Sequence, residues 1–391
     1  MRETYCIFSA NYLPNIGGVE KYTQNLAFAL DGLDKTVIIV TNNCFDLPSH
    51  ENISPNISIY RLPCYPLFNG RFPLPKKNTE YKKLLKQLNK EKIDYVSINT
   101  RFYPHTFTGV KLAESKDIKP IVVDHGSAYL TFGNSFIDIF VRAWEHFVTA
   151  LLKRHNIDFY AVSKAGLRWL TNFKITGKGV LNNSIDAKFF HTQSSQRDFR
   201  NELGLAESDF TVSFIGRFIP EKGIIPLTEA AKQLQSHTDI HFLFAGDGVL
   251  KKTIEEYQLS NVHLLGKIDS DDVAALLETS DCFCLPTRSE GFSTSLLEAA
   301  ACETTSIITH VGGVDELIPT SEYGIIIGDT SPETISKAIL ELYDNPESNK
   351  KMAKKIYKRV VNDFSWEKTA EKTISACQLV NKRNYIKAKE G

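Results

Sequence analysis

The sequence lacks the motifs that identify several common kinds of binding site. Its seven cysteines include no Cys-x-x-Cys pair and no Cys/His set at zinc-ligand spacing, so neither a disulfide framework nor a typical zinc site is indicated. A Gly-x-Gly-x-x-Gly dinucleotide fingerprint is missing, and so is the Gly-x-x-x-x-Gly-Lys-Ser/Thr phosphate loop. Any phosphate or nucleotide site must therefore be built from other residues.

Charge is divided unevenly between the two halves of the chain. Residues 1–190 contain 24 Lys and Arg against 16 Asp and Glu, whereas residues 191–391 contain 22 against 30. A basic first half favours an anionic partner, with independent drift of two domains as the alternative. The chain start becomes polar too early for a secretion signal, and no run of about 18 uncharged apolar residues is present. We therefore expect a cytoplasmic protein.

Short β-branched runs alternate with helical stretches along the whole chain. This alternation is typical of α/β proteins with doubly wound parallel sheets, and 391 residues are too many for one ordinary core. A polar segment, 191–209, has linker composition and separates two sets of strands. We therefore predict two Rossmann-like domains, 1–190 and 191–365, that face each other across a cleft.

Two carboxylates, Glu290 and Glu298, lie next to a predicted buried strand at 282–285. Glu290 falls in the turn after that strand, and Glu298 falls on the small-residue helix that follows. Open α/β sheets bind ligands at the carboxyl ends of their strands. The two carboxylates are therefore candidates to hold two hydroxyl-bearing parts of one ligand, with an ordinary surface turn as the alternative.

Cations and glycines occupy neighbouring strand ends in the second half. Arg217 and Lys222 lie on either side of a proline turn between Gly216 and Gly223. Arginine offers a forked contact and lysine a point charge, which together suit a pyrophosphate. The small-residue turn 246–248 ends another predicted strand, where a flat base can approach the backbone.

Two further candidates lie in the first half. Gly17 and Gly18 precede a predicted helix, where backbone N–H groups can approach a phosphate, with a flexible turn as the alternative. His125 closes a predicted strand. It is either a ligand-binding histidine or a structural one that is bonded to a backbone carbonyl.

Together these motifs resemble those of family 4 glycosyltransferases with the GT-B fold, over nearly the whole chain. The motifs that carry the resemblance are Gly17-Gly18-Val19-Glu20, His125-Gly126, Gly216-Arg217 with Glu221-Lys222-Gly223, Ala245-Gly246-Asp247-Gly248, Glu290 to Glu298, and Gly312-Gly313. The resemblance implies transfer of a sugar from a nucleotide-activated donor, with retention at the anomeric carbon.

The resemblance also implies a role for each residue. His125 meets the donor sugar, and Glu290 holds its hydroxyls. Arg217 and Lys222 neutralise the diphosphate, so no metal or other cofactor is expected, and Glu298 holds the ribose. The implied donor-binding set is Gly17, Gly18, Gly216, Arg217, Lys222, Gly246, Asp247, Gly248, Glu290, Gly291, Phe292, Ser293, Thr294 and Glu298.

Two further expectations come from the comparison with the family pattern. After Glu298 the family usually has Gly and Pro where this chain has Glu303 and Thr305, so we expect that turn to differ. The family also tends to end in a helix that crosses back to the first domain, which we expect within 366–391.

The implied function is transfer of a hexose or N-acetylhexosamine, with UDP as the expected carrier, to a glycan acceptor in cell-surface polysaccharide synthesis. A lipid-linked acceptor fits the basic first half. The alternatives are a soluble acceptor, such as a protein or small metabolite, and a non-catalytic subunit that binds a nucleotide-sugar. No nucleic-acid partner is expected, because no aromatic-interleaved basic motif is present.

Two segments of the first half are candidates for contact with the inner face of the cell membrane. Segment 67–92 is rich in lysine, and segment 132–154 has an apolar stripe at helical spacing. Aromatic residues near basic charge suit a lipid interface. A solvated charged face and a core-packing helix are the alternatives. The stripe consists of Phe136, Ile139, Phe140, Ala143, Trp144, Phe147, Val148, Leu151 and Leu152.

Overall fold

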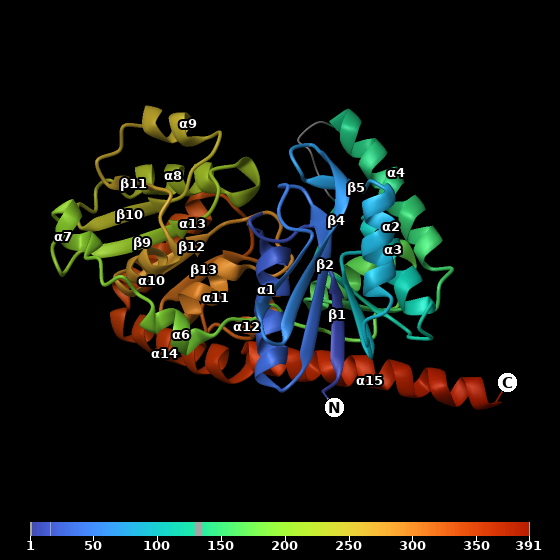
Figure 1. Cartoon of the computed structure of the whole chain (residues 1–391). Helices are drawn as coiled ribbons and strands as arrows, with labels where there is room; N and C mark the ends of the chain where they lie inside the picture. Colours follow the sequence, from blue (N-terminus) through green and yellow to red (C-terminus); the bar gives the residue numbers. More distant parts are fainter. Residues whose placement is uncertain (1, 16, 130–134, 391) are drawn as a thin grey trace. The chain divides into compact units, whose positions relative to one another are not determined.

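The computed structural model describes residues 2–15, 17–129 and 135–390 and divides into two compact units. The first unit comprises residues 1–183 together with 366–391, and the second comprises 184–365. Each unit contains one mainly parallel sheet with helices on both faces (Figure 1). The predicted α/β class with two Rossmann-like domains is therefore confirmed.

The first unit is built on an eight-stranded sheet. Its strands are β1 (Thr4–Phe8), β2 (Thr36–Asn43), β3 (His50–Ser54), β4 (Ile57–Leu67), β5 (Phe72–Pro75), β6 (Tyr95–Asn99), β7 (Ile121–Asp124) and β8 (Asp158–Ala161). Its helices are α1 (Gly18–Gly32), α2 (Thr79–Leu88), α3 (Pro104–Glu114), α4 (Ser135–Leu152), α5 (Lys164–Leu170), the 3₁₀ helix η1 (Thr171–Phe173) and α15 (Trp366–Glu390).

Strand order in this sheet reverses at its centre. The order is β3-β4-β2-β1-β6-β7-β8, so β1 is flanked by β2 and β6 and the loops after β1 and β6 diverge. The apolar runs of β1 and β7 are fully buried, as expected for parallel strands covered on both faces. The sheet is not entirely parallel, because β3 and β5 pair with β4 in antiparallel hairpins that the sequence did not predict.

The second unit is built on a six-stranded parallel sheet in the order β11-β10-β9-β12-β13-β14. Its strands are β9 (Phe210–Ile215), β10 (Ile240–Ala245), β11 (Val262–Gly266), β12 (Cys282–Leu285), β13 (Thr305–Thr309) and β14 (Ile325–Ile327). Its helices are α6 (Ala187–Thr192), α7 (Phe199–Leu203), η2 (Pro220–Lys222), α8 (Ile224–Gln233), α9 (Lys251–Glu256), α10 (Ser270–Glu278), α11 (Thr294–Ala301), α12 (Val314–Leu317), α13 (Pro332–Asp344) and α14 (Pro346–Asp363).

The division between the units differs from a boundary after residue 190. That position falls inside α6, whose residues pack on α11 and α10 of the second unit, so the division lies at 183/184 instead. The last helix, α15, groups with the first unit. Its Thr369 Oγ1 donates to the Asn182 carbonyl at 3.1 Å, and the rings of Trp366 and Tyr22 lie 5.3 Å apart.

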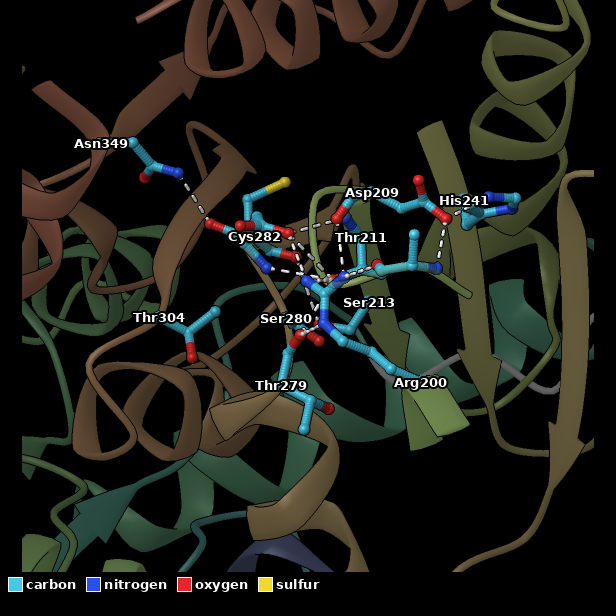
Figure 2. Close-up of polar contacts among 12 residues, drawn as sticks. Arg200, Asp209, Thr211, Ser213, His241, Thr279, Ser280, Cys282, Thr304 and Asn349 are labelled. Carbon is cyan, nitrogen blue, oxygen red and sulfur yellow. Dashed lines mark hydrogen bonds and ion pairs between the residues drawn. The ribbon is translucent and has the colours of Figure 1, made fainter. Parts of the chain in front are cut away.

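A polar network fixes the amino-terminal edge of the second sheet (Figure 2). Arg200 donates to the carbonyls of Thr279 and Asp209 at 3.2 and 2.7 Å, and it pairs with Asp281 at 2.8 Å. Thr211 Oγ1 also donates to the Thr279 carbonyl, at 3.0 Å. These bonds hold the starts of β9 and β12 side by side, so the loops that can vary for binding lie at the opposite, carboxyl edge.

Among the described residues, no helix is both long enough and apolar enough to cross a membrane.

Candidate functional site

The loops after β9 and β12 bring together two side chains predicted to bind a ligand. These strands are neighbours where the strand order of the second sheet reverses, which is where open α/β sheets bind ligands. Lys222 Nζ donates to Glu290 Oε1 in a tight ion pair, and their side chains are 21% and 14% exposed. A largely buried pair is screened less than a surface pair, so each side chain orients the other.

Two glycines allow the neighbouring loops to approach this pair. Gly223 has a φ of +71°, and a Cβ there would lie 1.9 Å from the Pro286 oxygen. Gly312 has a φ of +55°, and a Cβ there would lie 2.6 Å from the Glu290 oxygen. A side chain at either position would push the loops apart. Glycine therefore lets the loops after β9 and β13 hold the backbone of the Glu290 loop.

Arg217 and the turn 246–248 lie at the ends of the adjacent strands β9 and β10. The Arg217 side chain is exposed. Phe218 N donates to the Asp247 carbonyl at 2.9 Å, and Asp247 Oδ1 accepts from Gly248 N at 2.8 Å. The two loops are thus bonded to each other, which places a small-residue turn beside the arginine loop.

Helix α11 and the loop that leads into it carry the remaining predicted donor-binding residues of the second unit. Ser293 caps it, because its Oγ accepts from Leu296 N at 3.3 Å. Phe292 is buried, and its ring lies 5.6 Å from that of Phe364, so it anchors the loop rather than offering its ring to a ligand. The half-buried members of the predicted set on this segment are Glu290, Gly291, Thr294 and Glu298.

The turn after α11 keeps a glycine-type backbone although the glycine is replaced. Glu303 has a φ of +53°, and Thr304 N donates to the Ala299 carbonyl at 2.9 Å. This is the six-to-one bond of a Schellman cap, whose left-handed position is usually glycine. The Glu303 side chain is accommodated in this left-handed conformation at a cost of about 1–2 kcal/mol, and the difference from the family turn stays a prediction.

In the first unit, a hydrogen bond with Asn99 of β6, itself bonded to Thr23 of α1, fixes His125 at the end of β7. Its Nε2 lies 3.1 Å from Asn99 Oδ1, and Asn99 Nδ2 donates to Thr23 Oγ1 at 2.7 Å. Because the amide nitrogen of Asn99 is directed at Thr23, its oxygen accepts from His125, which assigns the proton to Nε2. Burial lowers the pKa of His125 to about 3, so the ring is neutral at pH 7 and Nδ1 is its acceptor atom.

A buried ion triad lies next to His125 and was not suggested by the sequence. Arg101 is 1% exposed and pairs with Asp124 at 3.3 Å and with Glu145 at 2.7 Å. Its guanidinium carbon lies 3.8 Å from the centre of the Phe173 ring. Burial raises the pKa of Asp124, against the lowering effect of Arg101. Removing one member would leave an uncompensated buried charge, so the triad holds helix α4 against the strand that ends at His125.

Thr100, which lies between the residues that make these two sets of contacts, has a strained backbone conformation. Thr100 has a φ of +68°, which is rare for a β-branched residue. It lies between Asn99, which holds His125, and Arg101, which holds Asp124. Strained residues of this kind persist where the surrounding structure over-determines them, and they gather at functional sites.

Gly17 and Gly18 begin α1 as predicted, with Gly17 in the N-cap position. The first turn of this helix carries Glu20, which is 7% exposed, and its Oε1 accepts from Asn15 Nδ2 at 3.0 Å. Burial raises the pKa of Glu20. A buried carboxylate near the helix start is a second feature that the sequence analysis did not single out.

The position of Asn99 and Arg101 at a strand end is a pattern in the sequence that indicates these two residues. Asn99 is the last residue of β6 and Arg101 lies two residues beyond it, as His125 follows β7, and polar residues in such positions share one edge of the sheet. No local pattern in the sequence indicates the role of Glu145. Its partner Arg101 lies 44 residues away in the sequence, and the notable pattern on its helix is the apolar stripe.

One group of possible metal ligands occurs in the described part of the chain. Atoms of His191, Glu278 and Cys302 lie within 4.8 Å of one another. They lie outside the predicted site, and His191 Nδ1 already pairs with Glu278 Oε1 at 2.9 Å. We assign this group no role.

Comparison with known proteins identifies two family models along the chain. The model described as Glycosyltransferase Family 4 matches residues 16–212, and the one described as Glycosyl transferases group 1 matches residues 195–359. Both halves of the chain are therefore matched, and the matched residues include every position of the predicted site.

Three similar proteins illustrate the range of relatives. An uncharacterized glycosyltransferase of Methanocaldococcus jannaschii is 28% identical over 361 residues, which cover 91% of this chain and 93% of the relative. The GPI3 subunit of phosphatidylinositol N-acetylglucosaminyltransferase from Saccharomyces cerevisiae is 23% identical over 369 residues, covering 93% and 80%. The structure of Anabaena HepE in complex with UDP has a TM-score of 0.72 at 16% identity and covers 97% and 100%.

Proposed function

This chain belongs to glycosyltransferase family 4 and is a transferase of the GT-B fold, and from that premise we propose its reaction. It moves a hexose or N-acetylhexosamine from a UDP-sugar to a lipid-linked glycan acceptor, with retention at the anomeric carbon, in cell-surface polysaccharide synthesis. The observation that carries the proposal is the Lys222–Glu290 ion pair at the reversal point of the second sheet.

The ion pair suits departure of a nucleoside diphosphate. The leaving phosphate gains negative charge in the transition state, and Lys222 and Arg217 are fixed cations at the end of one strand that can stabilise it. Glu290 holds the lysine in place and accepts from sugar hydroxyls. In this proposal Glu298, on the helix that follows, accepts from the ribose hydroxyls. We expect no metal, because the two cations supply the charge.

His125 contributes a neutral acceptor to the donor sugar. With its Nε2 proton engaged by Asn99, the Nδ1 lone pair can accept a hydrogen bond from a sugar hydroxyl. A neutral ring also avoids placing a third cation next to an oxocarbenium-like sugar. We name no nucleophile, since attack on the same face, with the leaving phosphate receiving the acceptor proton, requires none.

The donor and acceptor parts of the proposal have separate support. The HepE structure was solved with UDP, and the yeast relative is named for a phosphatidylinositol acceptor and an N-acetylglucosaminyl group. The basic first half of this chain suits an acceptor joined to a phosphate-bearing lipid at the inner face of the cell membrane. A soluble acceptor is the second candidate, and a non-catalytic partner protein that binds the nucleotide-sugar is the third.

Thermal stabilisation by UDP, GDP, ADP and their sugar conjugates tests the donor site first. Binding to the folded state at a hundredfold excess over Kd stabilises it by about 2.7 kcal/mol. We expect UDP and one UDP-sugar to raise the melting temperature, Arg217→Ala to abolish the rise, and Lys232→Ala, an exposed cation on α8, to retain it. No rise with any nucleotide would contradict the proposed donor site.

Analysis of the reaction products tests the proposed acceptor and the proposed retention at the anomeric carbon. Incubation of the stabilising UDP-sugar with a lipid-linked glycan acceptor should release UDP and give a product with the anomeric configuration of the donor, measured by NMR coupling constants. An inverted product would refute retention. Donor binding without transfer to lipid-linked or soluble acceptors would favour the non-catalytic role.

A further inference from the structure

The first unit carries a patch of exposed large apolar side chains, which we call the aromatic surface. Four of its members lie on α4, one is the last residue of β4, and one lies on the turn between β4 and β5. They are Ile139, Phe140, Trp144, Phe147, Leu67 and Phe68. A concentration of this kind on two adjoining elements is uncommon on a monomeric protein and marks an interaction site.

Helix α4 turns only the C-terminal part of its apolar stripe toward the core. Its aromatic side chains point outward, with Phe140 61% and Phe147 58% exposed. The side turned to the protein buries Val148 and Leu152 together with two polar residues, Glu145 and Thr149. The Glu145–Arg101 pair requires this orientation, so the aromatic residues are left outside. Residues 132–134 and the Phe136 side chain lie outside the described residues.

The β4–β5 hairpin and α4 form one continuous apolar groove. Phe72 of the hairpin and Trp144 of α4 meet edge to face with ring centroids 6.1 Å apart, and Trp144 Nε1 donates to the Phe102 carbonyl at 3.2 Å. The groove that these residues line has a volume of about 740 Å³. At the tip of the hairpin, Phe68 has a φ of +52° and is 57% exposed. A phenylalanine in this strained conformation is held outward by its turn.

A second groove, with lysines along it, adjoins the first. The two share Leu74, and the second has a volume of about 920 Å³. Four exposed lysines line it: Lys77, Lys82, Lys86 and Lys111. Within the described part of the chain none of the four forms an ion pair with a carboxylate. Their charge is therefore available to an anionic partner next to an apolar one.

We propose that the aromatic surface and the lysine-lined groove dock the protein on an anionic phospholipid bilayer. Aromatic side chains that enter the interface, with lysines facing the headgroups, are the combination that such a surface binds. A second copy of this chain would bring the same lysine rows together, and like charges across an interface oppose association. The proposal rests on the proposed function only in that a lipid-linked acceptor lies in the same bilayer.

Helix α4 is also connected to the end of β7, next to His125, by two buried ion pairs. Glu145 of α4 is bound by Arg101, and Arg101 binds Asp124, the residue before His125. The contact is buried throughout, so α4 and the end of β7 form one rigid element. A membrane contact through α4 would therefore fix the height of His125 above the lipid.

Co-sedimentation with vesicles tests the proposal without any donor or acceptor. We expect the full chain to bind vesicles of phosphatidylcholine with phosphatidylglycerol at least about tenfold more tightly than phosphatidylcholine alone, and to lose that difference in high salt. One lysine near an anionic surface contributes roughly a fivefold change in affinity. Lys82→Glu/Lys86→Glu should therefore weaken binding by more than about tenfold. The matched control, Lys351→Glu/Lys354→Glu on α14, should not.

A second double variant tests whether the apolar side chains of the aromatic surface contribute to vesicle binding. Phe140→Ser/Phe147→Ser should weaken vesicle binding by at least about tenfold, whereas Phe28→Ser, an exposed phenylalanine on α1, should not. All variants should keep the wild-type stabilisation by UDP, which separates loss of docking from loss of the donor site or of folding. Equal binding to neutral and anionic vesicles, or unchanged binding in either variant of the surface, would overturn the proposal. So would a dimer in light scattering that Phe140→Ser/Phe147→Ser dissociates, since the surface would then join two copies.

Discussion

The Lys222–Glu290 pair gives the sharpest quantitative test of the site. Lys222→Met removes the charge while keeping most of the side-chain volume, and Glu290→Gln removes the charge of its partner. If Lys222 stabilises the leaving diphosphate, its loss should cost about 10²–10³ in kcat, comparable to the loss of one oxyanion donor. Glu290→Gln should lower kcat less, because the amide keeps one acceptor for a sugar hydroxyl.

The structure predicts that these two effects are not additive. The two side chains are in direct contact and are both largely buried, so the double variant should differ from the sum by about 0.5–3 kcal/mol. Either single change leaves the other charge without its partner, whereas the double change removes both. We therefore expect Lys222→Met/Glu290→Gln to be more heat-stable than the less stable single variant.

The assay is a double-mutant cycle in kcat/KM, measured as UDP release, and in melting temperature. Lys232→Met on α8 serves as the control for loss of an exposed cation in the same unit and should leave both quantities unchanged. If the two substitutions add within about 0.3–0.5 kcal/mol in both quantities, the pair does not act as a unit and the reasoning from the structure is wrong.

Three other predictions concern single positions. Glu303→Gly should stabilise the protein by about 1 kcal/mol, since it relieves the left-handed side chain, and raise the melting temperature by about 2–4 °C, whereas Glu303→Ala should give no gain. Glu145→Ala should lower the free energy of unfolding in urea by about 3–5 kcal/mol because it leaves Arg101 short of a buried partner, and Glu114→Ala, at an exposed carboxylate, should change it little. Burial lowers the pKa of His125 to about 3 in the folded chain, whereas in the unfolded chain the histidine binds a proton near pH 6.5. The free energy of unfolding therefore falls as the pH falls from about 6.5 to about 3. His125→Asn should remove about 1–2 kcal/mol of that loss between pH 7 and 5, measured by urea unfolding, and the same change at the exposed His310 should not.

Sequence reasoning located the strand ends but not the contacts that join them. The pattern around Glu290 and the loop with Lys222 were both recognisable, because buried parallel strands give short apolar runs that end in polar turns. That the two side chains form one ion pair was not predictable. The pairing depends on β9 and β12 being neighbours, and strand order is a long-range property that no local pattern records.

The division of the chain into two units was also not fully predictable from the sequence. The polar composition of residues 191–209 indicates a linker, yet α6 ends in this segment and α7 lies within it, and both helices belong to the second unit. Polar residues in that segment serve as helix caps: Asp198 Oδ1 accepts from Asn201 N at 3.0 Å. Capping residues and linker residues have the same composition, so only the packing of the short helices separates the two interpretations.

Helix α4 shows why periodicity alone could not decide between a core-packing helix and a surface one. Its apolar stripe is real, and a helix with such a stripe usually turns it inward. Here Val148 and Leu152 of the stripe are buried on the same side as Glu145, whose carboxylate pairs with the buried guanidinium of Arg101. The ion pair fixes the rotation of the helix, which leaves Phe140 and Phe147 exposed. The two unusual features of the first unit, a charged triad inside and an aromatic surface outside, are thus consequences of one another.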